Sequence, residues 1–126
     1  MLAGANFPFV SANLAQVIVR QRGRKVLLVD CDLRISRLHH VLGAPALPGL
    51  TEYLRGEVNE FDIVQKGPLE NLYFVPGGRS VSNPADLLAG SRLAKLLDRL
   101  APLFDWVIID TPPAVPITDA SMIANL

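Results

Sequence analysis

"KVLLVDCDLR", residues 25–34, is an apolar run that ends abruptly in two aspartates on either side of a cysteine. A short, nearly continuous apolar run is typical of a strand covered on both faces, as the strands of a parallel sheet are. Carboxylates are costly to bury unless a cation or hydrogen-bond donors meet them. The stretch therefore predicts a buried parallel strand that brings Asp30 and Asp32 to a cation or to donors at its carboxyl end.

Two further runs have the same character, "LYFV" at 72–75 and "WVIID" at 106–110. In open α/β sheets ligands bind outside the carboxyl ends of the strands. Asp30, Asp32 and Asp110 all lie at such ends, so we expect them to face one common site.

Helical patterns alternate with these three runs, and they predict helices at 9–22, 49–56 and 83–100. Strands that alternate with helices predict an α/β fold in which right-handed crossovers build a doubly wound parallel sheet.

Length and composition fit a single domain over residues 1–126, with 50% hydrophobic and 19% charged residues. Twelve basic and twelve acidic residues give zero net charge, which argues against a nucleic-acid partner. No apolar run approaches the roughly 20 residues that span a bilayer. Cys31 is the only cysteine, so an intrachain disulfide is excluded and a cytosolic location is expected.

The spacing of Asp30 and Asp32 would place both side chains on one side of an extended chain, with Cys31 packed away from them. Mg²⁺ takes oxygen ligands and uses one or two carboxylates together with substrate phosphates. The alternative is that one aspartate caps the next turn while the other is solvated. "VIIDTPP" (107–113) is a second acidic strand end, and it has the form of a Walker B strand, whose aspartate holds Mg²⁺ in P-loop enzymes.

Several motifs occur together in one order: "FVSANLA" (9–15), "KVLLVDCDLR" (25–34), "RLHHVLGAPALPGLTEYLRGE" (37–57), "NPADLLAGSR" (83–92) and "VIIDTPPAVPITDA" (107–120). In this combination the chain closely resembles the cytoplasmic kinase domain of the bacterial tyrosine autokinases of capsule and exopolysaccharide synthesis. That family belongs to the P-loop branch of the MinD and ParA ATPases. The resemblance implies a P-loop NTPase-like α/β fold with a parallel sheet, here incomplete at both ends, and thus a single partial kinase domain.

The resemblance also implies roles for individual residues. Asp30 and Asp110 would organise Mg²⁺, and Asp32, with Asp30 beside it, would be catalytic by orienting or deprotonating a tyrosine hydroxyl. Asp30, Asp32, Arg34 and Asp110 would together bind ATP. For Arg34 a salt bridge to an aspartate is an equally good interpretation.

One motif departs from the family pattern. A P-loop reads G-x-x-x-x-G-K-[ST], in which backbone N–H groups and the lysine hold the phosphates and the hydroxyl binds Mg²⁺. The alignment puts Asn6 at the second glycine, Phe7 at the lysine and Pro8 at the serine or threonine. The family also has a central β-strand before this loop, whose absence would leave neighbouring strand edges unpaired.

Three functions remain open at this point. The first is an ATP-dependent protein-tyrosine autokinase that regulates capsule or exopolysaccharide synthesis at the cytoplasmic face of the plasma membrane. Its partners would be further kinase copies and a membrane-bound polysaccharide co-polymerase that activates it. The second is a catalytically degenerate relative that binds partners without ATP, and the third is a MinD- or ParA-like positioning ATPase. A dinucleotide-binding domain is excluded, because the sequence has no G-x-G-x-x-G.

Overall fold

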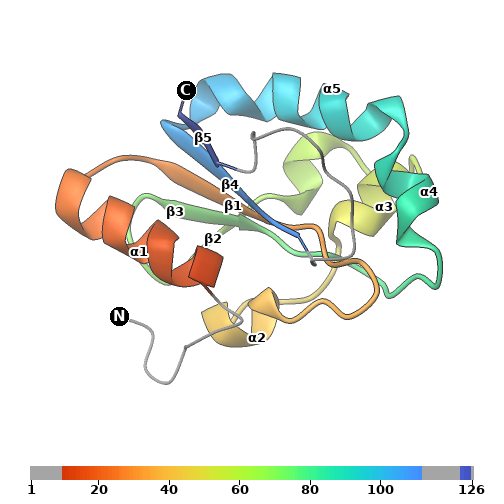
Figure 1. The fold of residues 1–126 in the computed structure, drawn as a ribbon, viewed down its shortest axis with the longest axis horizontal. Coiled ribbons are helices and arrows are strands. Elements are labelled where there is room, and N and C mark those ends of the chain that lie inside the picture. The colour runs from red at the N-terminus through yellow and green to blue at the C-terminus, as the bar shows by residue number, and fades with distance from the viewer. Residues whose placement is uncertain (1–9, 112–122, 126) are drawn as a thin grey trace.

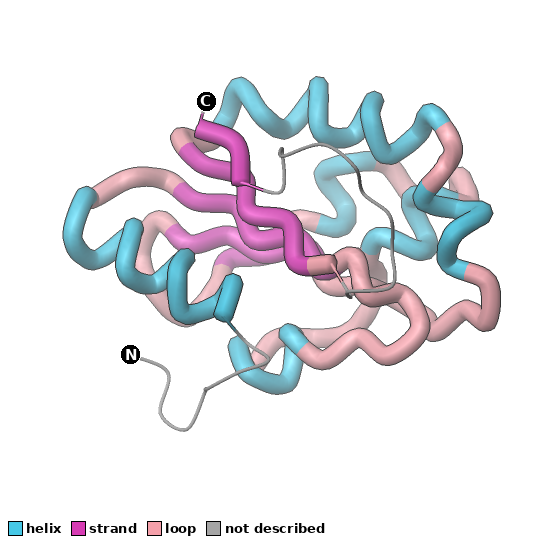
Figure 2. Tube along the Cα trace, viewed as in Figure 1, coloured by secondary structure: helices cyan, strands magenta, loops and turns pink. Residues whose placement is uncertain are grey.

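The computed structural model describes residues 10–111 and 123–125. It has a three-layer α/β arrangement, in which one sheet lies between two groups of helices (Figures 1 and 2). The helices are α1 (Val10–Arg22), α2 (Leu38–Leu42), α3 (Leu50–Leu54), α4 (Pro84–Leu88) and α5 (Ser91–Leu100), with the 3₁₀ turns η1 (Glu60–Ile63) and η2 (Ala101–Leu103). The strands are β1 (Val26–Asp30), β2 (Gln65–Lys66), β3 (Leu72–Val75), β4 (Trp106–Asp110) and β5 (Ile123–Asn125).

The sheet has the order β2-β3-β1-β4-β5, with β1 at its centre. The predicted strands β1, β3 and β4 are all present and pair in parallel. The sheet as a whole is mixed, because β2 pairs with β3 and β5 pairs with β4 in the antiparallel direction. The predicted α/β fold with a parallel sheet is confirmed in its three central strands, and the two outer strands add antiparallel pairs. On the side of β4 away from β1, β5 pairs with residues 106–108.

Side chains alternate along β1 between two apolar cores. On one side of the sheet, α1 and α2 pack on Val26 and Leu28. On the other side, α3, η1 and α5 pack on Leu27 and Val29. Figure 1 shows α1 and α2 on one face of the sheet and α3 and α5 on the other. Every residue of β1 is buried, which explains why its sequence is apolar without a polar face.

The prediction of a single helix at 83–100 is wrong, because the chain forms two helices in this range. Pro84 does stand in the first turn of α4, but α4 ends at Leu88, and Gly90 adopts an extended conformation as the N-cap residue of α5. Glycine carries little helix propensity, so the chain can turn at this point. The helix predicted at 9–22 is confirmed over Val10–Arg22 as α1, and residue 9 lies outside the described residues. The helix predicted at 49–56 contains only the five residues of α3.

Candidate functional site

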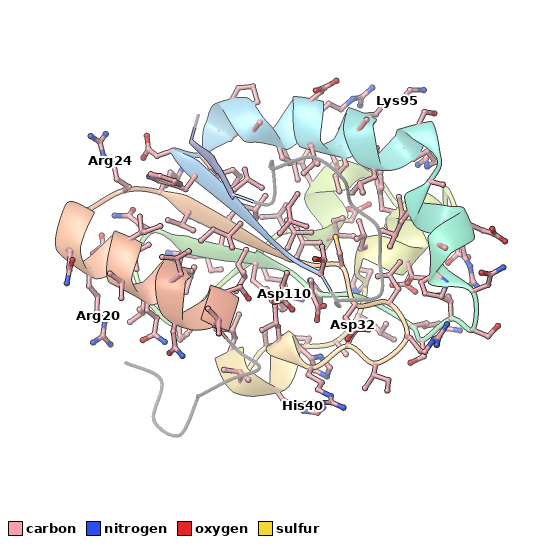
Figure 3. All side chains as sticks on the ribbon, viewed as in Figure 1. Arg20, Arg24, Asp32, His40, Lys95 and Asp110 are labelled. Atoms are coloured by element: carbon pink, nitrogen blue, oxygen red, sulfur yellow. The ribbon has the colours of Figure 1, made fainter. Side chains whose placement is uncertain are left out.

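The carboxyl ends of β1 and β4 bring three aspartates together, and we call Asp30, Asp32 and Asp110 the acidic edge. Asp30 and Asp110 are direct register partners, and the backbone N–H of Cys31 continues the ladder to the Asp110 carbonyl at 2.8 Å. Figure 3 shows Asp32 and Asp110 at this end of the sheet. The three aspartates therefore lie at the same end of the sheet and influence one another's pKa, whereas their common site stays a prediction.

Asp30 is a fully buried carboxylate held by backbone donors. Its Oδ1 accepts the N–H of Asp32 at 3.0 Å, and its Oδ2 accepts the N–H of Leu38 at 3.3 Å. The pKa of Asp30 is raised to about 7: burial is the main cause, the charges of Asp110 and Asp32 add to the rise, and the two backbone donors oppose it. Asp30 thus organises the chain from the end of β1 to the start of α2, as the capping interpretation expected of one aspartate.

Asp32 is half-buried and lies in the turn that follows β1. Its Oδ1 accepts the N–H of Ile35 at 3.1 Å, and its carbonyl accepts the Ser36 hydroxyl at 2.7 Å. The alternation of side chains continues beyond the strand, because Cys31 and Leu33 are fully buried in the core of the α5 side. The prediction that Cys31 packs away from the aspartates is confirmed.

Asp110 is partly buried, and its Oδ1 accepts the hydroxyl of Ser11 at 2.7 Å. Burial raises the pKa of Asp110, the Ser11 hydrogen bond lowers it, and the charge of Asp32 raises it. Sequence reasoning did not single out Ser11, although it lies inside the quoted "FVSANLA". No local signal joins it to a residue 99 positions away.

Arg34 is exposed and contacts a neighbouring loop. Its Nη2 donates to the Ser82 carbonyl at 3.3 Å, and its own carbonyl accepts the Ser80 hydroxyl at 2.9 Å. Within residues 10–111 the ion pairs are Arg24–Asp105 and Arg99–Glu60, so the proposed salt bridge from Arg34 to an aspartate is not formed. The acidic edge lacks an ion-paired cation in this part of the chain.

The loop after β3 is fixed by a second buried carboxylate that the sequence did not reveal. Glu52 of α3 accepts the N–H of Gly49 at 2.7 Å and the N–H of Arg79 at 3.2 Å. Gly77 of the same loop lies against Ser36 and the Asp32 carbonyl. The loop thus supports the turn that carries Asp32.

The carboxylate oxygens of the acidic edge are the candidate ligands for Mg²⁺. The described residues contain no group of three or more His, Cys, Asp or Glu side chains placed to hold a metal by themselves. Asp30 already uses both oxygens for backbone donors, whereas Asp110 and Asp32 each accept one hydrogen bond from the residues named above. This set fits a magnesium ion that arrives with nucleotide phosphates and takes one or two carboxylates.

The predicted changes in the P-loop, at Asn6, Phe7 and Pro8, lie outside the described residues. None of the helices in the described ranges is both long enough and apolar enough for a membrane crossing.

Comparison with known proteins gives a consistent result. The AAA domain family matches residues 8–125 of the chain. The tyrosine-protein kinase ptk of Acinetobacter johnsonii is 36% identical over 117 residues, which cover 93% of this chain and 16% of that protein. The chain thus spans about one sixth of the length of this curated relative.

Solved structures show the same likeness. The kinase domain of the Escherichia coli tyrosine kinase ETK has a TM-score of 0.78 and 33% identity, over 90% of this chain and 44% of that one. The septum site-determining protein MinD of Pyrococcus horikoshii, solved with Mg-ADP, has a TM-score of 0.69 and 31% identity, over 84% of this chain and 43% of that one. The expected P-loop fold of MinD type is confirmed.

Proposed function

We propose that the chain, which belongs to the AAA domain family and is similar to bacterial tyrosine-protein kinases, carries the acidic part of an ATP-dependent protein-tyrosine kinase site. One observation supports the proposal above others. Asp30 and Asp110 are register partners at the carboxyl ends of β1 and β4, and the pKa values of both are raised. Within residues 10–111, no ion-paired cation balances their charges. Such unfavourable electrostatics are typical of functional sites.

Each aspartate has a separate role in this proposal. Asp110 would hold the magnesium ion, which would neutralise charge on the nucleotide phosphates when bound. Asp32 would orient the tyrosine hydroxyl and accept its proton. Asp30 holds the turn after β1, which carries Asp32, through its two backbone hydrogen bonds.

The protein that contains this domain would phosphorylate tyrosines on a neighbouring copy of itself. It would act at the cytoplasmic face of the plasma membrane with a membrane-bound activator of polysaccharide export. These partners are proposed from the family of the relatives.

The 126-residue chain itself is expected to bind ATP poorly. Phe7 and Pro8 stand where the family has an ammonium and a hydroxyl. Hydrogen bonds to charged groups contribute roughly 1.5–3 kcal/mol each, so two losses weaken binding at least about a hundredfold. The same two residues favour a second candidate function, a relative that binds partners without ATP.

The test restores the loop and then removes the acidic edge. Calorimetric titration with Mg-ATP should detect no micromolar binding by the natural chain. The variant Asn6→Gly/Phe7→Lys/Pro8→Thr should bind, and adding Asp110→Asn should weaken that binding at least tenfold. Asp98→Asn, on an exposed position of α5, serves as the matched control and should have no effect.

Two results would overturn the proposal. If the restored variant is folded by circular dichroism and still fails to bind Mg-ATP, the acidic edge is not a nucleotide site and the partner-binding function is favoured. If Asp110→Asn leaves the binding of the restored variant unchanged, β4 is not the Walker B strand.

A further inference from the structure

Ser11 ties the first turn of α1 to the end of β4. Its hydroxyl donates to Oδ1 of Asp110 at 2.7 Å in a partly buried position. The two residues are 99 positions apart, so the bond depends on the packing of α1 against the sheet. Ala12 and Ala15 of α1 are fully buried in that packing, and they fix where residue 11 lies.

A single hydroxyl donor has a specific effect on a carboxylate. It fixes the rotation of the side chain, because one of the two oxygens is held toward the donor. A carboxylate that is fixed in this way is already oriented when a divalent cation arrives.

In the sequence, position 11 is three residues beyond position 8, where the P-loop pattern has a hydroxyl and this chain has Pro8. The hydroxyl that the described structure offers to the Walker B aspartate therefore comes from a later residue of the chain.

Resting on the proposed function, we propose that Ser11 is a positioning residue, whose hydroxyl holds Asp110 in the orientation that receives a divalent cation bound to nucleotide phosphates. Ser11 does not itself contact the reacting atoms. It acts through Asp110, so its loss affects the metal requirement more than the affinity for the nucleotide alone.

The experiment measures the Mg²⁺ concentration that gives half-maximal ATP binding in the loop-restored variant. Ser11→Ala should raise this midpoint about tenfold, while ATP binding without Mg²⁺ stays unchanged. Ser11→Thr retains the hydroxyl and should keep the midpoint within about twofold. Ser80→Ala is the matched control, because it removes a hydroxyl that donates to the Arg34 carbonyl near the same edge, and the midpoint should not move.

The outcomes separate the two proposals. If the restored variant binds ATP with Mg²⁺ and Ser11→Ala leaves the midpoint unchanged, Ser11 has only a structural role and the inference is wrong. If Ser11→Ala weakens binding equally with and without Mg²⁺, the inference is also wrong. Absence of all ATP binding overturns both proposals. Circular dichroism checks folding, and Ser11→Cys, which keeps the size and weakens the donor, replaces an alanine variant that unfolds.

Discussion

Two charged regions of this molecule use the same residue types in opposite ways. At the acidic edge, three carboxylates gather and burial raises the pKa of Asp30 and Asp110. At the corner between η1 and α5, Nη1 of Arg99 donates to both carboxylate oxygens of Glu60, at 3.0 and 3.2 Å. There the pKa of Glu60 is lowered, first by its own backbone N–H and next by Arg99.

The aromatic surroundings of the corner complete the contrast. The guanidinium of Arg92 lies 4.6 Å from the centre of the Tyr53 ring, and its Nε donates to the Tyr53 carbonyl at 3.0 Å. Charges at the corner thus have partners within the domain, whereas the carboxylates of the edge repel one another. This contrast favours a structural role for the corner and supports the proposed ligand site at the edge.

The largest expected effect is a dependence of stability on pH that originates at the edge. The pKa of Asp30 is about 7 when folded and 3.8 as its ordinary value, so between these pH values only the folded chain keeps the proton. Stability should therefore fall as the pH rises from about 4 to about 7 and then level off. A shift of this size corresponds to at most about 4 kcal/mol.

Urea unfolding between pH 4 and pH 8 measures this slope. Asp30→Asn should flatten it, and Asp98→Asn should leave it as it is. The corner titrates in the opposite sense, since the lowered pKa of Glu60 gives stability that is lost only as the solution becomes more acidic than about pH 4.5. Stability that increases from pH 4 to pH 7 would contradict the assignment of a buried, protonated Asp30.

An intermediate effect is expected from two glycines that occupy the same kind of position, the N-cap residues Gly49 of α3 and Gly90 of α5. A Cβ on Gly49 would overlap the backbone of Pro76 and Gly78, in the loop that supports the edge. At Gly90 the nearest atom would be the Leu87 carbonyl oxygen, 3.7 Å away.

Gly49→Ala should therefore destabilise the chain by about 1–3 kcal/mol, the usual range for overpacking. Gly90→Ala should be close to neutral. Thermal unfolding of the two variants and of the natural chain measures the difference. Equal losses of stability in both variants would mean that the loop after β3 is not tightly packed.

The smallest effect should follow from breaking the corner pair. Arg99 is 63% exposed, and ion pairs at such positions contribute little to stability and are screened by salt. Glu60→Gln should shift the unfolding midpoint only slightly, and 0.5 M salt should abolish even that difference. A large loss of stability that persists in 0.5 M salt would show that the Arg99–Glu60 pair contributes strongly to folding.

The sequence predicted those parts of the fold that repeat a simple pattern. The apolar runs of β1, β3 and β4 identify buried strands, and the acidic residue at the end of two of them predicts the site. β2 and β5 were missed because strands of two and three residues at a sheet border show no period. The break at Gly90 was missed because the apolar stripe continues across it.

The details of the site were harder to predict than its location. Both the Ser11–Asp110 bond and the contact of Glu52 with Arg79 join residues that are distant in sequence. Such contacts follow from the packing of whole helices on the sheet. A carboxylate that accepts backbone N–H groups, as Glu52 and Asp30 do, looks in the sequence like any other acidic residue.

The two hydrogen bonds of Asp30 connect the buried end of β1 to the turn and the helix that follow it. Any cation drawn to the edge competes with the amides of Asp32 and Leu38 for the same oxygen lone pairs, and any proton on Asp30 weakens one of those bonds. Leu38 begins α2, and the same short helix presents His40 to the solvent (Figure 3). A change in the charge of Asp30 would therefore act on the hydrogen bond that holds the start of α2.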